Sequence, residues 1–207
     1  MSLENEELRR QEDYLKLLAQ QYPDISSVCT EIINLNAIRN LPKGTEHFMS
    51  DLHGEDEAFR HILNNGSGVI REKVDMVFAH SMPEKERAWF ATLIYYPREK
   101  MEEIKRDTVN MDDWYSITLY RLVEVCKLVA SKYTRSKVRK AMPEAFGYIL
   151  DELLHTNYDE ENKQSYYQHI ISTIIDINRA EEVIECLCSL IKRLAVDCLH
   201  IVGDIYD

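Results

Sequence analysis

Basic residues are scarce in this chain of 207 residues, where 25 Lys and Arg stand against 36 Asp and Glu and leave a net charge of −11. A protein that binds a phosphate backbone needs clustered Lys and Arg, so this balance argues against a nucleic-acid partner. It does not argue against a small phosphorylated ligand, because a metal ion can reverse the local field of an acidic site.

Long apolar runs are also missing. No stretch approaches the roughly 20 apolar residues of a transmembrane helix, and the opening MSLENEELRR is acidic rather than signal-like. The five cysteines are odd in number, and most lie in apolar helical or strand patterns. We therefore expect a cytoplasmic protein with reduced thiols and no membrane partner. The C-x-C pair Cys186 and Cys188 fits two ordinary helix positions better than a metal site.

Repeats of fixed period are absent, which argues against a solenoid. Apolar residues at steps near 3.6 instead predict helices over almost all of residues 56–195. Pro97 should split one of these helices, and Pro143 should lie in the first turn of another. Two more helices precede this region, and Asp24 or Ser26 is expected to cap the second.

Two short apolar segments, about 45–50 and 197–202, predict strands on either side of the helical region. Each strand ends in an acidic turn, SDLHGE after the first and GDIYD after the second. The pattern predicts a mainly α chain with two short parallel strands, organised as one unit over 1–207. Ligands gather at the carboxyl ends of parallel strands, so both turns would face one site if the strands pair.

The two acidic turns contain the candidate metal ligands. Asp51 and His53 lie two positions apart at the end of an extended segment, so their side chains project to the same side. A solvated turn with a surface histidine is the alternative. The pentapeptide GDIYD, with Asp204 and Asp207, is rarer for this composition, and its alternative is an Asp-rich turn that caps a helix.

The motifs Asp51-x-His53 and Gly203-Asp204-x-x-Asp207 resemble the first two signature motifs of the calcineurin-like metallophosphoesterases. Together with the long helical segment between them and the words FMSDLHGE, FAHSMPEKERAWFATLIYYPREK and HIVGDIYD, the chain is similar to the N-terminal portion of the class III fructose-1,6-bisphosphatases of bacteria. The resemblance covers essentially the whole chain. It implies the N-terminal fragment of an α/β metallophosphoesterase sandwich that carries a large helical insertion.

This resemblance implies a hydrolase that removes the 1-phosphate of fructose 1,6-bisphosphate, a step of gluconeogenesis, with two Mn²⁺ ions. It makes Asp51 and His53 ligands of the first metal and Asp204 a bridge between the two. Asp207 would orient the catalytic histidine of a third motif without touching the metal. Independently of the resemblance, carboxylates combined with imidazole suit Mn, Fe or Zn rather than Ca.

Several parts of the family pattern are absent from the sequence: the Gly-Asn-His-Asp/Glu motif, two later metal-binding histidines and the arginine that follows the second motif. His200 is not a substitute, because it lies inside the second strand on the same face as Val202. We therefore expect an incomplete site and no catalysis by this chain alone. The alternative is a noncatalytic helical module for oligomerisation or regulation, in which the acidic turns are remnants.

Two further expectations concern surfaces. Unpaired strand edges and an uncovered apolar face favour self-association, so we expect a homo-oligomer. The only concentrated basic run spans residues 132–140. It is either a solvated helix end or an anion site for an effector phosphate, formed by five side chains: Lys132, Arg135, Lys137, Arg139 and Lys140.

Overall fold

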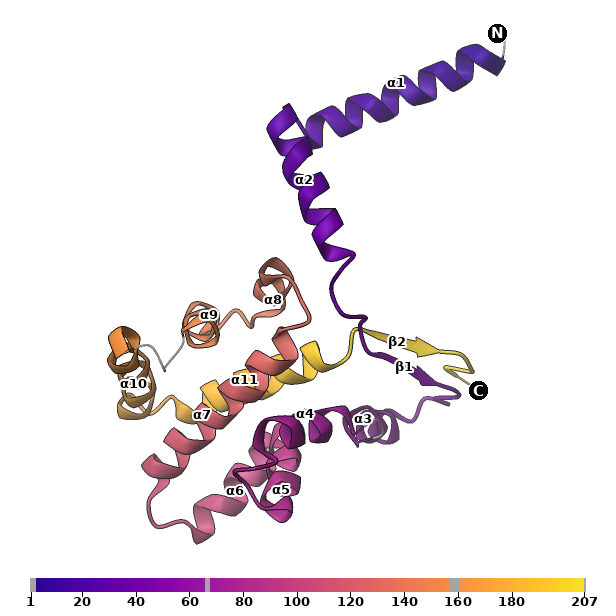
Figure 1. The fold of residues 1–207 in the computed structure, drawn as a ribbon. Coiled ribbons are helices and arrows are strands. Elements are labelled where there is room, and N and C mark those ends of the chain that lie inside the picture. Colours follow the sequence, from indigo (N-terminus) through magenta and orange to yellow (C-terminus); the bar gives the residue numbers. More distant parts are fainter. Residues whose placement is uncertain (1–2, 66–67, 157–160, 207) are drawn as a thin grey trace. The chain divides into compact units, whose positions relative to one another are not determined.

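The computed structural model describes residues 3–65, 68–156 and 161–206, without the side chains of 3–5, 64–65 and 161–162. The chain divides into two compact units, Met1–Pro42 and Lys43–Asp207. Figure 1 draws both units along the chain.

The first unit consists of helices α1, Leu3–Gln21, and α2, Ile25–Ile38. Of the two candidate caps, Asp24 and Ser26, it is Asp24 that caps α2. Its Oδ1 accepts the Ser27 amide at 2.8 Å, and the Ser27 hydroxyl lies 3.4 Å from the Asp24 amide nitrogen. This reciprocal capping box satisfies donors that the first helical turn leaves open. All of α2 is described, and it buries none of its residues.

The second unit contains two strands and nine helices among its described residues. The strands are β1, Glu46–Met49, and β2, Cys198–Ile201. The helices between them are α3 Asp56–Asn65, α4 Val69–Phe78, α5 Glu84–Tyr95, α6 Pro97–Asp107, α7 Met111–Ala130, α8 Arg135–Ala141, α9 Gly147–His155, α10 Glu161–Asp176 and α11 Ala180–Ala195.

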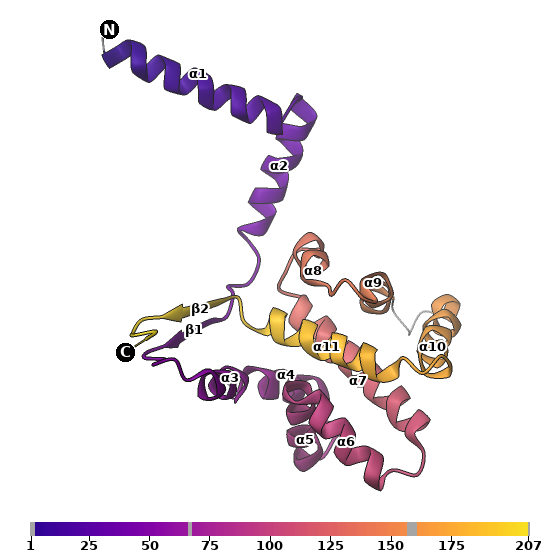
Figure 2. The ribbon, with the colours of Figure 1, turned by 180° about the vertical axis from the view of Figure 1, so that it is seen from behind.

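Helices α7 and α11 pack side by side at the centre of this unit (Figures 1 and 2). Helices α4, α5 and α6 lie on one side of the pair, and α8, α9 and α10 lie on the other. The contact faces carry apolar residues at helical spacing, and burial of this apolar stripe holds each amphipathic helix against its neighbours. The fully buried side chains of the two central helices include Leu119, Leu122, Val123, Cys126, Val183, Ile184, Leu187, Cys188 and Ile191.

The cysteine pair of α11 occupies ordinary helix positions. Cys188 is fully buried, and burial raises the pKa of its thiol to about 12. Cys186 is only half-buried, because residues two apart on a helix do not face the same way. All five cysteines are free.

Of the two helix boundaries predicted from prolines, the structure has the one at Pro97 and not the one at Pro143. Pro97 begins α6 directly after α5 ends at Tyr95, as expected. The prediction for Pro143 was wrong, because α9 begins only at Gly147. Phe146 precedes that helix with a φ of 60°, a left-handed conformation that cannot continue a helix from Pro143.

The predicted fold class, mainly α with two short parallel strands, is confirmed. Among the helices in the described ranges, none is both long and apolar enough to cross a bilayer. Strand β2 follows directly after α11, and β1 precedes α3. The two strands run side by side away from the central helices, so both acidic turns lie at the far end of the strand pair (Figure 1).

Candidate metal centre

The two strands form a parallel pair with a defined register. Glu46 lies opposite Cys198, and Met49 lies opposite Ile201. The Val202 amide donates to the Met49 carbonyl at 2.9 Å, which extends the pairing past the end of β2. Because the strands are parallel, the segments that follow β1 and β2 both leave the sheet at its carboxyl end. The prediction that these strands are adjacent and parallel is therefore confirmed.

Beyond the strands, the two acidic turns are hydrogen-bonded to each other. The Asp204 carbonyl accepts the Leu52 amide at 2.7 Å and the His53 amide at 3.4 Å, and the Ile205 carbonyl accepts the Gly54 amide at 3.0 Å. One carboxylate also takes part, since Asp51 Oδ1 accepts the Asp204 amide at 3.0 Å. A charge-assisted bond of this kind holds one turn against the other.

Glycine is required where the turns touch. A Cβ at Gly203 would lie 2.2 Å from Asp51 Oδ1 and 2.9 Å from the Asp51 amide nitrogen, so any side chain would push the turns apart. On the facing turn, His53 has a φ of 47° and Gly54 a φ of 70°. A left-handed conformation at a histidine is uncommon, and the hydrogen bonds to the second turn hold it there.

The opposite, entry ends of the strands are held by a charged cluster around Asp197. Its Oδ2 accepts the Thr45 amide at 2.8 Å and Lys132 Nζ at 2.9 Å, and its Oδ1 accepts Lys137 Nζ at 2.8 Å. Gly44 leaves room for this carboxylate, because a Cβ there would lie 2.6 Å from the carboxyl carbon of Asp197. We call Asp197, Lys132, Lys137 and Thr45 the Asp197 cluster.

Electrostatics inside the Asp197 cluster favour the charged form of the acid. Burial by itself would raise the pKa of Asp197, but hydrogen bonds from Lys137, Tyr133 and Lys132 outweigh it and hold that pKa far below the usual range. Burial and the neighbouring carboxylate raise the pKa of Tyr133, which stays a neutral phenol. The cluster is thus an ion pair network at neutral pH.

This network changes the interpretation of the basic run. Lys132 and Lys137 share one carboxylate, that of Asp197. Arg135 lies 3.2 Å and Arg139 3.8 Å from Asp151 Oδ2. Two carboxylates of the chain, Asp197 and Asp151, therefore pair with four of the five cations. These contacts occupy donors that an effector phosphate would need, but they leave the basic run with an excess of positive charge, so the effector-phosphate site stays a hypothesis.

The predicted metal ligands lie on the two joined turns. The side chains of Asp51, His53 and Asp204 are exposed, and Asp207 is outside the described residues. Within the described ranges, no group of three or more His, Cys, Asp or Glu side chains is placed to hold a metal ion. The backbone of the turns is thus brought together, whereas the three side chains do not converge on one point.

His200 contacts groups on the open face of the strand pair. Its Nε2 lies 2.8 Å from Glu46 Oε2, and its ring stacks on Phe48 with centroids 4.6 Å apart. These contacts agree with the interpretation of His200 as a strand residue.

Asp197 is the residue of this region that the sequence did not reveal. Its only signal was an acidic residue directly before a strand, which does not identify its partners.

The second unit is mainly helical, and its two parallel strands carry joined acidic turns at their carboxyl ends. Ligands of open parallel sheets bind at that end of the strands. A sequence profile of the Firmicute fructose-1,6-bisphosphatases matches residues 13–207. The chain therefore belongs to the Firmicute fructose-1,6-bisphosphatase family.

Individual relatives agree with this assignment. The class 3 fructose-1,6-bisphosphatase of Clostridium novyi (strain NT) is 60% identical over 194 residues, which are 94% of this chain and 29% of the relative. The proteins of the same name from Clostridium botulinum strains Loch Maree and Hall are 60% and 59% identical over the same shares. The chain thus spans less than a third of the length of these relatives. No solved structure matches it significantly.

Proposed function

We propose that this chain supplies the strand-end turns of a metal-dependent phosphatase that hydrolyses the 1-phosphate of fructose 1,6-bisphosphate. One observation carries the proposal: the Asp51 carboxylate accepts the Asp204 amide at 3.0 Å, so the two motifs that should share a site are joined although they lie 153 residues apart. Family membership and the names of the relatives support the reaction and the substrate.

The donor types on the turns fit a divalent metal such as Mn²⁺. Asp51, His53 and Asp204 would hold it, since carboxylate oxygens and an imidazole nitrogen suit first-row metals. The missing Cβ at Gly203 supports the same assignment, because it allows the two turns to approach as a shared site requires. When bound there, two such ions would supply activation of a water molecule and stabilisation of the phosphoryl oxygens.

Asp51 and Asp207 are given further roles in this proposal, and the number of ligands limits what the chain does alone. Asp51 keeps the second turn in place through the Asp204 amide, so one carboxylate both positions the backbone and offers ligand atoms. Asp207, outside the described residues, is proposed to orient a histidine that the sequence does not contain. Three direct ligands are too few for two ions, so residues 1–207 alone should bind Mn²⁺ weakly and hydrolyse no substrate above background.

A chimera provides the test. Residues 1–207 replace the matching segment of the Clostridium novyi relative, and phosphate release from fructose 1,6-bisphosphate is measured with Mn²⁺ for the chimera, the unmodified relative and this chain alone. Asp51→Asn and Asp204→Asn should each abolish Mn²⁺-dependent turnover of the chimera, whereas Asp107→Asn, an exposed acid elsewhere, should not. Turnover by this chain alone, or a chimera indifferent to both site substitutions, would show that the site has been assigned to the wrong residues.

A role in self-association is a second candidate, favoured by the apolar side chains of the first unit. Ile25 and Ile33 of α2 are 82% and 69% exposed, and such side chains usually pack against something. We propose that the chain forms homo-oligomers in the cytoplasm, where its free cysteines stay reduced. Sedimentation velocity should detect dimers or larger species, and a single monomeric species at high concentration would contradict this.

A further inference from the structure

Helix α2 has an apolar face that no described part of the chain covers. Six of its 14 residues are β-branched, which is a poor composition for a helix that stands alone. Most helices of this kind are held in place by burial of an apolar face, yet α2 buries none of its residues. We therefore expect this face to have a partner outside the chain.

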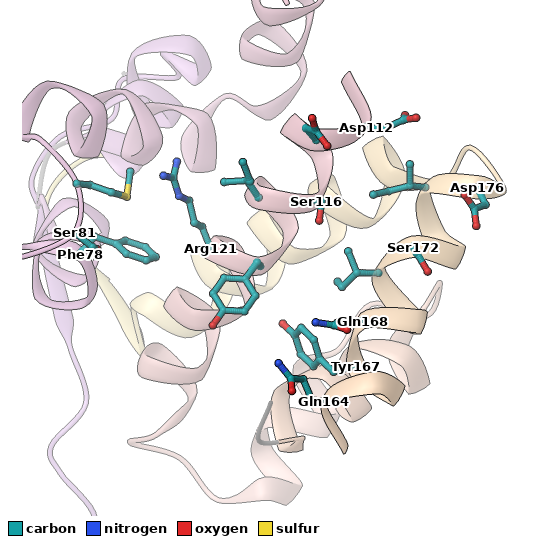
Figure 3. Close-up of a pocket in the computed structure, with 16 residues that line it drawn as sticks. Phe78, Ser81, Asp112, Ser116, Arg121, Gln164, Tyr167, Gln168, Ser172 and Asp176 are labelled. Atoms are coloured by element: carbon teal, nitrogen blue, oxygen red, sulfur yellow. The ribbon is translucent and has the colours of Figure 1, made fainter. Parts of the chain in front are cut away.

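The second unit shows how the same chain treats apolar helix faces elsewhere. Tyr167 and Ile171 of α10 are buried although they border the open groove between α7 and α10 that Figure 3 draws. On α2, by contrast, Ile25 is 82% exposed and Ile32 is 53% exposed. The exposure of apolar side chains on α2 is thus a property of the first unit and not of the chain in general.

The exposed apolar residues of α2 have the spacing of a coiled coil. They are separated by steps of three, four and three residues, so they occupy the first and fourth positions of a seven-residue repeat. We call this stripe the α2 seam, and it consists of Ile25, Val28, Ile32 and Leu35. Isoleucine at both first positions is typical of seams between two helices.

The α2 seam suits a second copy of itself because the helix carries almost no charge. Glu31 is the only charged residue from Ile25 to Ile38, in a chain whose net charge is −11. The face opposite the seam presents neutral polar residues such as Thr30 and Asn34. Two copies that meet along α2 therefore bring few like charges together, which removes the main electrostatic obstacle to the association of an acidic protein.

The available apolar area is close to what a dimer needs. The contributing side chains are the α2 seam, its neighbours Ile33 and Ile38, and Leu8 and Leu15, which lie seven residues apart on α1. At about 60–120 Å² for each fully exposed side chain, two copies would bury about 500–1,100 Å² of apolar surface. A standard interface of about 1,200–2,000 Å², about 65% of it apolar in homodimers, contains about 800–1,300 Å² of apolar surface.

We propose that the first unit is a homodimerisation module, in which the α2 seam of one copy packs along the α2 seam of a second copy and α1 adds the stripe of Leu8 and Leu15. The partner of this face is thus a second copy of the chain. The inference rests on the self-association proposed above and assigns it to one surface. It does not depend on the proposed phosphatase activity.

Sedimentation velocity of residues 1–207 at a series of concentrations, under reducing conditions, measures the dimer. Ile32→Glu should raise its Kd by about 10- to 200-fold, because each copy loses the burial of one half-exposed side chain. Thr30→Glu makes the same change in charge on the opposite face of the helix and should leave the Kd unchanged. Because α2 buries none of its residues, urea unfolding of the second unit should be the same in both variants, which excludes misfolding as the cause.

Mixtures of variants test whether the partner of α2 is α2 itself. Ile32→Lys alone should dissociate like Ile32→Glu. An equal mixture of the two should recover the dimer if the helices are parallel, because like positions then face each other. Ile32→Glu mixed with Val28→Lys should recover it if the helices are antiparallel. Recovery in one mixture supports the proposal and gives the direction of the helices, and recovery in neither overturns it.

Three other outcomes would overturn the proposal. A single monomeric species of the unmodified chain at all concentrations would overturn both this inference and the self-association on which it rests. A dimer that persists in Ile32→Glu would overturn only the assignment to α2. In the chimera with the Clostridium novyi relative, a monomeric mass together with a loss of stability in Ile32→Glu would mean that the rest of the longer protein covers α2.

Discussion

The Asp197 cluster should control the stability of the strand pair that carries the candidate metal centre. Through Asp197, directly before β2, it joins that strand to Thr45, directly before β1. Lys132 ties the same carboxylate to the segment between α7 and α8, and Lys137 ties it to α8. The sharpest perturbation is Asp197→Asn. It removes the negative charge and keeps a side-chain oxygen that can still accept the Thr45 amide.

The expected magnitude follows from the exposure of the two lysines. The side chains of Lys132 and Asp197 are each 15% exposed, so loss of this charged hydrogen bond should cost about 1.5–3 kcal/mol. Lys137 is 56% exposed, and its pair with Asp197 should contribute at most about 1 kcal/mol. We therefore expect Asp197→Asn to lower the free energy of unfolding of the second unit by about 1.5–4 kcal/mol.

Urea unfolding followed by far-UV circular dichroism measures this change, and hydrogen exchange of the Val202 amide reports on the strand pair directly. Lys132→Met should cost far more than Lys137→Met, which is the matched control because it removes the same charge from the same carboxylate. The double variant Asp197→Asn with Lys132→Met should show a coupling free energy of about 0.5–3 kcal/mol. Equal effects of the two lysine variants, or a change below about 0.5 kcal/mol for Asp197→Asn, would refute the reasoning.

The pH dependence has a definite sign. The folded-state pKa of Asp197 lies below its unfolded value of about 3.9. Its contribution to stability is therefore fully present above about pH 4 and is lost as the pH falls through the folded pKa. The difference in unfolding free energy between the wild type and Asp197→Asn should be constant from pH 8 to pH 5 and should shrink below about pH 4. A difference that grows as the pH falls would contradict this assignment.

Three further predictions concern the turns, the metal and the core. Gly203→Ala should separate the acidic turns, because its Cβ would clash with Asp51, and the amides of Leu52 and Gly54 should then exchange faster with solvent; unchanged exchange would contradict the close approach. Calorimetric titration with Mn²⁺ should show weak binding by residues 1–207 and none by Asp51→Asn, whereas equal binding by both would exclude this carboxylate as a ligand. Leu187→Ala, in the fully buried centre of α11, should destabilise the second unit by about 2–5 kcal/mol in urea unfolding, and a loss below 1 kcal/mol would mean that this face is not in the core.

The sequence by itself determined the elements of this protein. Helices between residues 56 and 195 follow from apolar residues at steps near 3.6, because only one face of each helix is buried. Pro97 separates α5 from α6 because it fixes its own backbone and lacks an amide donor. The two strands and their acidic turns were also predictable, since a short apolar segment followed by glycine and aspartate is a local pattern. Family-level motifs added the pairing of those strands.

Only the tertiary structure decided which charges meet. Lys132 and Lys137 form part of an evident basic run, but their partner, Asp197, lies 65 and 60 residues further along the chain. Ion pairs depend on how α7 and α11 pack, and a periodic pattern contains no information about that. The same holds for Phe146, whose left-handed backbone delays α9 to Gly147.

The candidate site divides in the same way. The two motifs identified Asp51 and Asp204 as residues that should share a site. Each motif follows a strand, and the carboxyl ends of parallel strands lie at the same end of a sheet. The contact itself, an Asp51 oxygen on the Asp204 amide with Gly203 against it, is set by backbone geometry in three dimensions.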